Sequence, residues 1–230
     1  MKNKKATHIG VILSFVIFTT FIIFMVVVLK PTSGVKNTER ATIELLKNNV
    51  ENFASSEIIS IILSRQAAGK CFIFDETGWG LEGLNYAIRN QDNVNIKSER
   101  VGKVLYLTEY VDNEIYKLDY SSEPLTHDFS STPGKCKDLN NFSIRKTENI
   151  FETKINELIL KQATNYSGLK SDFNMPSEKD FGIIFEFENS TMIGPPLPEQ
   201  KKSTYVKRFQ IIYLDTYANE KSGFFTIYVV

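Results

Sequence analysis

The sequence predicts an α+β protein, in which an N-terminal transmembrane helix precedes one external domain that combines an antiparallel β-sheet with two helices. Three observations predict this fold class. Residues 9–29 form an uninterrupted apolar run, two later segments carry apolar residues at helical spacing, and the other apolar segments are short and rich in aromatic and β-branched residues. Helical stripes that alternate with groups of such strands are typical of α+β domains.

The apolar run from Ile9 to Leu29 is long enough to cross a membrane. As a helix its 21 residues span roughly 31 Å, which matches a hydrocarbon core of about 30 Å. A buried helix of a soluble domain rarely runs this long without a polar face. A cleavable secretory signal has a shorter apolar region and a small-residue cleavage site, and no such site follows Leu29. We therefore predict an uncleaved anchor in the lipid bilayer.

The charges on the two sides of this run predict its orientation. Lys2, Lys4 and Lys5 precede it with no acid among them, whereas Glu39 and Glu44 dilute the basic residues that follow it. Short loops that are rich in lysine and arginine stay on the cytoplasmic side of a membrane. We therefore expect a single-pass protein of the cell membrane, with a cytoplasmic N-terminus and an extracytoplasmic C-terminal domain.

These features divide the chain into a basic leader at residues 1–8, the transmembrane helix at 9–29, a hinge at 30–36 and the external domain at 37–230. The 27 basic residues balance the 27 acidic ones over the whole chain. Four lysines flank the apolar run, so the rest of the chain has a net charge of about −4. Nucleic-acid binding requires a basic surface, and nucleic acid is therefore not an expected partner.

The N-terminal segment, KKATHIGVILSFVIFTTFIIFMVV, resembles type IV pilin-like proteins, in particular small archaeal surface proteins with an N-terminal membrane anchor. In that family a dedicated peptidase removes a short leader after a small residue just ahead of the apolar stretch. The resemblance implies cleavage after Ala6, and Gly10 is a second position of this kind. Unlike bacterial pilins, this chain has no glutamate near the start of the run.

Two segments of the external domain have the spacing of amphipathic helices. The first carries Ile43, Leu46, Val50 and Phe53 on one stripe, and this stripe could pack on its own domain or on a neighbouring copy. The second is ENIFETKINELILKQAT, at residues 148–164. Its residues on one side are Phe151, Ile155, Leu158, Ile159 and Gln162.

The remaining apolar segments predict strands. Residues 103–120, KVLYLTEYVDNEIYKLDY, have the pattern of a hairpin that turns at Asp112–Glu114. In FGIIFEFE, Phe181, Ile183 and Phe185 point the same way, as in a half-buried strand. Residues 205–217 and 223–230 are apolar on both faces and predict a central antiparallel pair.

Cys71 and Cys136 are the only two cysteines. An even number of cysteines in an outward-facing domain predicts a disulfide between them. The alternative is two unpaired cysteines, one of them buried as a small hydrophobic residue.

No catalytic motif, cofactor site or metal site is recognisable, so an enzyme is not expected. His127 precedes Asp128 but lies in a polar loop without the surroundings of a catalytic triad. Asp75 and Glu76 follow a strand and have the position of a solvated strand end. Trp79, between two glycines, could stack on a sugar or cover the edge of the core, and the second role is the commoner one.

Three sequons, at Asn141, Asn165 and Asn189, are possible glycosylation sites of an external domain. We expect a structural or adhesive role, as a pilin-like subunit or a surface binding module. Copies of the chain or other envelope proteins are the expected partners. The alternative is a membrane-anchored sensor or accessory domain that binds an extracytoplasmic ligand or an envelope complex.

Overall fold

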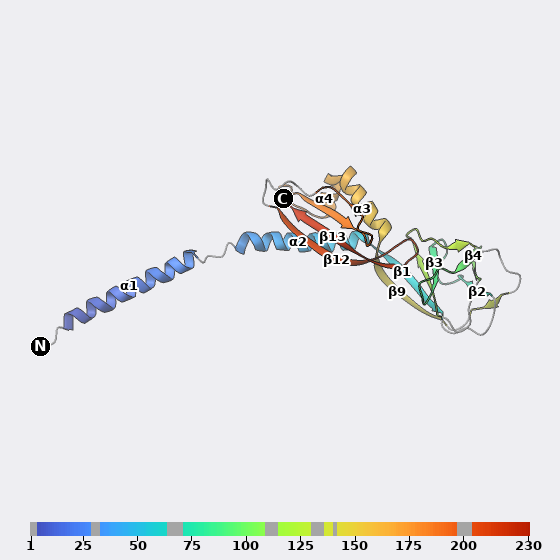
Figure 1. Ribbon diagram of the computed structural model, residues 1–230, viewed down its shortest axis with the longest axis horizontal. Coiled ribbons are helices and arrows are strands. Elements are labelled where there is room, and N and C mark those ends of the chain that lie inside the picture. The colour runs from blue at the N-terminus through green and yellow to red at the C-terminus, as the bar shows by residue number, and fades with distance from the viewer. Residues whose placement is uncertain are drawn as a thin grey trace. The chain divides into compact units, whose positions relative to one another are not determined.

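The computed structural model describes residues 4–28, 33–63, 71–108, 115–129, 136–139, 142–196 and 204–230 (Figure 1). These residues contain four helices and two β-sheets. The chain divides into two compact units, Met1–Glu44 and Leu45–Val230. Each unit is described by itself.

The first unit contains helix α1 (Lys4–Val28) and the beginning of helix α2 (Ser33–Ala54). The predicted transmembrane helix at residues 9–29 is wrong, because no helix in the described ranges is both long and apolar enough to cross a membrane.

Part of the predicted hinge at residues 30–36 is helical. Residues 33–36, which include Gly34, belong to α2, whereas residues 30–32 lie outside the described part of the chain. The stripe predicted on this helix is buried at Ile43, Leu46 and Val50. Phe53 is partly buried and packs edge-on against Phe173, with 6.4 Å between the ring centroids.

The predicted single sheet with two helices is also wrong, because the second unit contains two sheets. The larger sheet has the strand order β11-β10-β13-β12-β9-β1-β6-β3. Its strands are β1 (Ser55–Leu63), β3 (Asn85–Asn90), β6 (Tyr116–Ser121), β9 (Phe142–Phe151), β10 (Phe181–Glu186), β11 (Met192–Ile193), β12 (Tyr205–Leu214) and β13 (Glu220–Val229).

The smaller sheet has the order β7-β4-β5-β2-β8. Its strands are β2 (Phe72–Asp75), β4 (Lys97–Val101), β5 (Val104–Leu107), β7 (Asp128–Phe129) and β8 (Lys137–Asp138). The two sheets share one apolar core, to which Ile61 of β1 and Leu118 of β6 contribute from the larger sheet and Phe74 of β2 and Leu105 of β5 from the smaller one.

The predicted hairpin at residues 103–120 is wrong, because its two halves belong to different sheets. Its first half is β5, which pairs with β2 and β4, and its second half is β6, which pairs with β1 and β3. The predicted turn lies outside the described residues. Alternating apolar residues fit a strand that faces another sheet as well as a strand that pairs with its neighbour.

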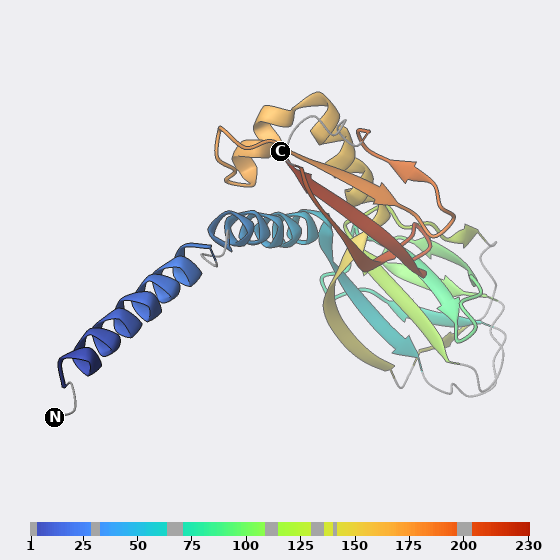
Figure 2. The ribbon, with the colours of Figure 1, turned by 60° about the vertical axis from the view of Figure 1, so that its left-hand side comes forward.

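The predicted central pair of strands is confirmed. β12 and β13 pair antiparallel over their full lengths, from Tyr205 opposite Val229 to Leu214 opposite Glu220. Both lie inside the larger sheet, between β10 and β9. Helices α3 (Glu152–Thr164) and α4 (Tyr166–Asp172) lie beside this part of the sheet (Figure 2). As predicted, α3 turns Ile155, Leu158 and Gln162 inward, and all three are buried.

The predicted disulfide is confirmed. Cys71 and Cys136 are bonded, with 4.7 Å between their Cα atoms. The residues that follow each cysteine form the parallel pairing of β2 with β8, in which Phe72 lies opposite Lys137. The bond therefore holds the last strand of the smaller sheet against its neighbour.

Candidate functional site

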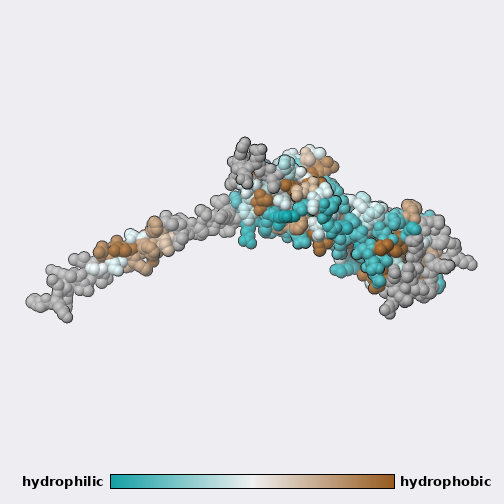
Figure 3. All heavy atoms as spheres, viewed as in Figure 1, coloured by the Kyte–Doolittle hydropathy of each residue, from teal (hydrophilic) through white to brown (hydrophobic). Residues whose placement is uncertain are grey.

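The first unit presents an apolar helix surface. Its large hydrophobic side chains between residues 12 and 25 are exposed by 39% at Met25 to 69% at Phe15 (Figure 3). They point in all directions around α1, because consecutive residues such as Ile22, Ile23 and Phe24 are all exposed. The hydroxyls of Thr19 and Thr20 donate to backbone carbonyls of the same helix, at 2.7 and 2.9 Å. Large exposed apolar surfaces typically mark sites of interaction.

The side chains on one face of α1 leave a groove between them. A shallow open groove of about 500 Å³ follows the helix, lined by Gly10, Leu13, Ser14, Ile17, Phe18 and Phe21. A Cβ at Gly10 would have no other atom within 4 Å, so the groove is open above this residue. Small residues one turn apart, here Gly10 and Ser14, allow the backbone of another helix to approach closely. Ala6, the predicted cleavage position, lies in the first turn of the same helix.

In the second unit, one face of the larger sheet carries a buried ion pair. Arg89 of β3 donates from Nη2 to Oδ2 of Asp119 on β6 at 2.9 Å, and both side chains are almost fully buried. Asp119 also accepts from the hydroxyl of Ser60 and lies 3.4 Å from Nζ of Lys117. Nε of Arg89 is buried without a hydrogen-bond partner among the described residues.

Two cavities adjoin this ion pair and share Ile62, Lys117 and Glu220. One, of about 300 Å³, is also lined by Arg89, Asn90, Gln91, Asn93 and Ile115. The other, of about 320 Å³, is also lined by Ser60, Arg145, Thr147, Glu148 and Asn149. Both are lined by basic and acidic side chains, so the cavities suit a polar ligand rather than a strongly charged one.

A third cavity, of about 410 Å³, lies near the turn between β12 and β13. It is lined by Glu152, Glu188, Asp215 and Tyr213 among others. Burial raises the pKa of Glu152, and the neighbouring Asp215 raises it further. Asp215 itself accepts hydrogen bonds from the backbone N–H groups of Tyr217 and Asn219, so it acts as a turn residue.

The position predicted for Glu76, a solvated strand end, is wrong. Glu76 is 1% exposed and contacts residues of both sheets. Its Oε1 accepts from the hydroxyl of Tyr120 at 2.8 Å and from Nε of Arg100 at 3.1 Å. Burial raises the pKa of Tyr120, and the adjacent carboxylate raises it further. Asp75 is exposed, as predicted, and accepts from the backbone N–H of Thr77.

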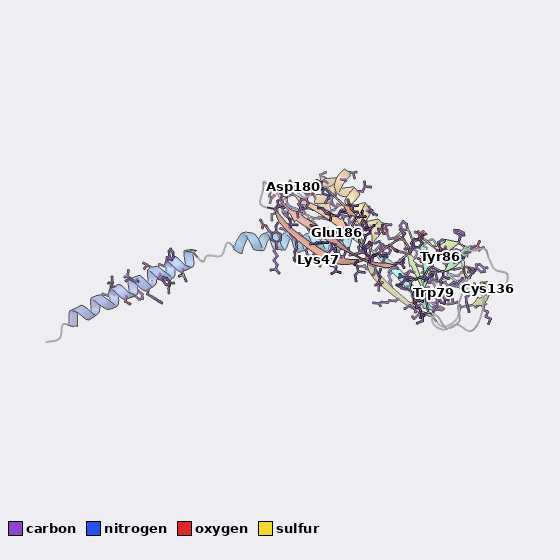
Figure 4. The ribbon with its side chains drawn as sticks, in the orientation of Figure 1. Lys47, Trp79, Tyr86, Cys136, Asp180 and Glu186 are labelled. Carbon is purple, nitrogen blue, oxygen red and sulfur yellow. A yellow bond between two sulfur atoms is a disulfide. The ribbon has the colours of Figure 1, made fainter. Side chains whose placement is uncertain are left out.

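The aromatic residues singled out by the sequence lie near this pair. His127 stacks on Tyr86, with ring centroids 4.1 Å apart and an angle of 22° between the rings. Trp79 is 48% exposed and packs edge-on against Phe142, so it covers the core with only part of its ring. Figure 4 places Trp79, Tyr86 and Cys136 toward the same end of the second unit.

Two of the three predicted glycosylation sites are described, and their side chains are exposed. Oδ1 of Asn165 accepts from Gly168 N at the start of α4, and Oδ1 of Asn189 accepts from Thr191 N in the turn between β10 and β11. Asn141 lies outside the described residues. Glycosylation stays a prediction.

Comparisons with protein families, with curated proteins and with solved structures find no match for this chain.

Proposed function

We propose that this protein is a structural subunit, similar to a pilin, that assembles with copies of itself through α1. The observation that carries the proposal is the exposure of apolar side chains on every side of this helix. Transfer of one such side chain from water into a helix–helix contact stabilises the contact by about 1.5–3 kcal/mol. Many contacts of this size favour an assembly in which each α1 is surrounded by several others.

The groove on α1 supports packing between helices. The residues that line it include two small ones, Gly10 and Ser14, and two aromatic ones, Phe18 and Phe21. Ridges of one helix fit into such grooves of another when small residues lie at the crossing point. An α1 from a second copy has side chains of the right chemistry to fill this groove.

The disulfide supports a place outside the reducing cytoplasm. Cys71 and Cys136 are bonded, and structural disulfides persist mainly in oxidising compartments. An external assembly of this kind fits a structural or adhesive role. In this proposal the leader before Thr7 is removed after Ala6, as in the pilin-like proteins that the N-terminus resembles.

The assembly is tested with the full chain, purified in a mild detergent that is then removed by dialysis. We expect elongated polymers in electron micrographs and sedimentation of the wild-type protein as large particles. Ile17→Asp places a charge in the groove, so this variant should not polymerise and should sediment as small particles. The matched control is Ile212→Asp, because Ile17 and Ile212 are exposed by 61% and 64% and Ile212 lies on β12.

The proposal is supported if the Ile212→Asp variant forms polymers and the Ile17→Asp variant does not. A wild-type protein that stays monomeric after detergent removal contradicts it. Equal behaviour of the two variants also contradicts it, because the assembly would then not depend on α1.

A second candidate function is a ligand-binding domain, favoured by the two adjoining cavities beside Arg89 and Asp119. Lys117 lines both cavities, so Lys117→Gln should weaken any ligand that occupies them. Thermal unfolding in the presence of glucose and of serine, two polar compounds without a net charge, tests this candidate. A rise in Tm for the wild type that is lost in the variant supports it, and no rise with either compound counts against it.

A further inference from the structure

Strand β9 has one paired edge and one open edge. Its first edge pairs antiparallel with β1 over nine residues, from Phe142 to Ile150. Its second edge pairs with β12 only at Ile150 and Phe151. In the described part of the chain, residues 143–149 have no strand on this side. Figures 1 and 2 show β9 diverging from β12 beyond this short contact.

The open edge is accessible. Ser143, Ile144, Arg145 and Lys146 are exposed, and so is Glu148. An open strand edge presents a row of backbone N–H and C=O groups that can pair with another strand. Lysine on such an edge normally discourages pairing, unless the added strand brings an acid to the opposite position.

A second β9 strand can bring this acid, because Glu148 lies two residues after Lys146. If two β9 strands pair antiparallel about Thr147, Lys146 of each copy lies opposite Glu148 of the other. Arg145 then lies opposite Asn149, and the two Thr147 residues face each other. Opposite charges and threonine pairs at facing positions both stabilise antiparallel strands. Every facing pair between residues 145 and 149 is therefore complementary.

An unbalanced negative charge at Glu148 within the single chain also favours this pairing. Glu148 lies directly opposite Glu57 of β1, and like charges at facing positions destabilise a sheet. Lys146 compensates Glu57, with 2.5 Å between Nζ and Oε2. Among the described residues no lysine or arginine forms an ion pair with Glu148. Lys146 of a second copy would supply the missing partner.

We propose that β9 of a second copy of this chain pairs antiparallel with this edge, centred on Thr147, and joins two larger sheets into one. This contact is separate from α1. It is therefore tested in the full chain carrying Ile17→Asp, so that the assembly through α1 does not decide the outcome.

The first test measures the register. Both natural cysteines are in the disulfide, so Thr147→Cys adds the only free thiol. Facing residues of paired strands have Cβ atoms about 4.5–5.5 Å apart, within reach of a disulfide after small adjustments. Under mild oxidation Thr147→Cys should form a covalent dimer. Ser143→Cys, on the same face of β9, should not, because its two copies lie about eight residues apart along the pair.

The second test exchanges the charges. Lys146→Glu and Glu148→Lys each place like charges opposite one another twice in a homodimer, so each variant alone should be monomeric. A mixture of the two variants should form a heterodimer, in which both facing pairs are again opposite in charge. The double variant Lys146→Glu/Glu148→Lys should dimerise like the parent protein.

Sedimentation equilibrium and native mass spectrometry measure these species. Circular dichroism spectra that match the parent establish that each variant is folded. Heterodimers on mixing, with monomers before mixing, support the pairing and its register. Monomers in the parent protein, or dimers that ignore the charge exchange, overturn it. A cross-link at Ser143→Cys that equals the one at Thr147→Cys overturns the register.

Discussion

The side-chain amide of Gln162 takes the place of a neighbouring strand beside Ile183. Nε2 of Gln162 donates to the carbonyl oxygen of Ile183 at 3.1 Å, and Oε1 accepts from the Ile183 N–H at 2.8 Å. Tyr166 does the same for Phe181, since its hydroxyl accepts from Phe181 N at 2.9 Å and lies 3.1 Å from Phe181 O. Helices α3 and α4 therefore close this edge of β10, in contrast to the open edge of β9.

Replacement of Gln162 should destabilise the second unit. Gln162→Leu keeps a side chain of similar size but removes its amide, which leaves the N–H and C=O of Ile183 without these partners. Each buried backbone group left unsatisfied costs about 1–3 kcal/mol. Chemical denaturation measures the change, and Gln210→Leu, at an exposed position of β12, is the control. Equal losses of stability in the two variants would contradict this role.

Removal of the disulfide should also lower stability. Cys71→Ala combined with Cys136→Ala opens a loop closed between residues 65 positions apart. The chain-entropy estimate for a loop of this length is roughly 4 kcal/mol. Urea unfolding of the double variant measures it, and reduction of the wild-type protein by dithiothreitol should give a similar decrease. A midpoint unchanged by either treatment would refute the estimate.

Two arginine–carboxylate pairs should respond differently to the same substitution. Arg100→Met leaves Glu76, whose side chain is 1% exposed, as a buried charge without its cation. The expected loss is about 3–5 kcal/mol. Arg208→Met breaks a pair with Glu186 at 2.7 Å, in which the arginine side chain is 50% exposed. Surface pairs contribute about 0–1 kcal/mol.

This comparison is well matched because both guanidinium groups also lie over aromatic rings. Arg100 lies 4.5 Å from the centroid of the Tyr86 ring and Arg208 lies 3.8 Å from that of Phe224. Thermal and urea unfolding of both variants provide the measurement. A larger loss at Arg208 than at Arg100 would show that burial of Glu76 does not determine the effect.

His127 should make stability depend on pH in the mildly acidic range. Burial lowers its pKa, and Arg100 lowers it further, whereas Asp128 opposes the change. The unfolded chain binds a proton at His127 below about pH 6.5, but the folded chain does so only at lower pH. The contribution of this residue is therefore complete above pH 6.5 and decreases as the pH falls.

Urea midpoints between pH 7.5 and 5 measure this dependence. His127→Phe keeps a ring against Tyr86 and removes the titrating group, so its stability should change less over this interval. If the wild type and the variant lose stability in parallel, another group is responsible.

Local patterns predicted the elements whose partners lie close in the sequence. β12 and β13 are joined by a short turn, and two segments that are apolar on both faces on either side of it were sufficient to predict the pair. The stripe on α3 was equally local, since Ile155, Leu158 and Gln162 repeat at helical spacing. The disulfide followed from the number of cysteines and not from any knowledge of their positions.

Elements that pair over long distances were not predictable in this way. β5 and β6 have the pattern of a hairpin, yet Tyr116 lies opposite Leu63 and Asn90 in the larger sheet. Nothing local distinguishes a chain that turns back on its neighbour from one that crosses to a second sheet. The length of the apolar run likewise predicted a membrane-spanning helix that the described residues of α1 do not form.

The polar residues inside the second unit were missed for a related reason. Arg89 and Asp119 each interrupt an apolar strand, which is a detectable signal of a buried charge. Their pairing depends on β3 and β6 being neighbours in the sheet, and that order is not contained in either segment. The complementary order of residues 145–149 is visible in the sequence. Its meaning depends on the open edge of β9, which only the strand order reveals.

The bond between Cys71 and Cys136 also limits how far the chain can lengthen under a pulling force. When a chain is pulled from its two ends, the residues between the cysteines remain inside a covalent loop and bear no load. The 65 positions that the bond spans would add roughly 220 Å to a fully extended chain. A chain that is unfolded under tension is therefore shorter at its limit by that length. Reduction of the bond releases the hidden length as a separate step in a force–extension curve.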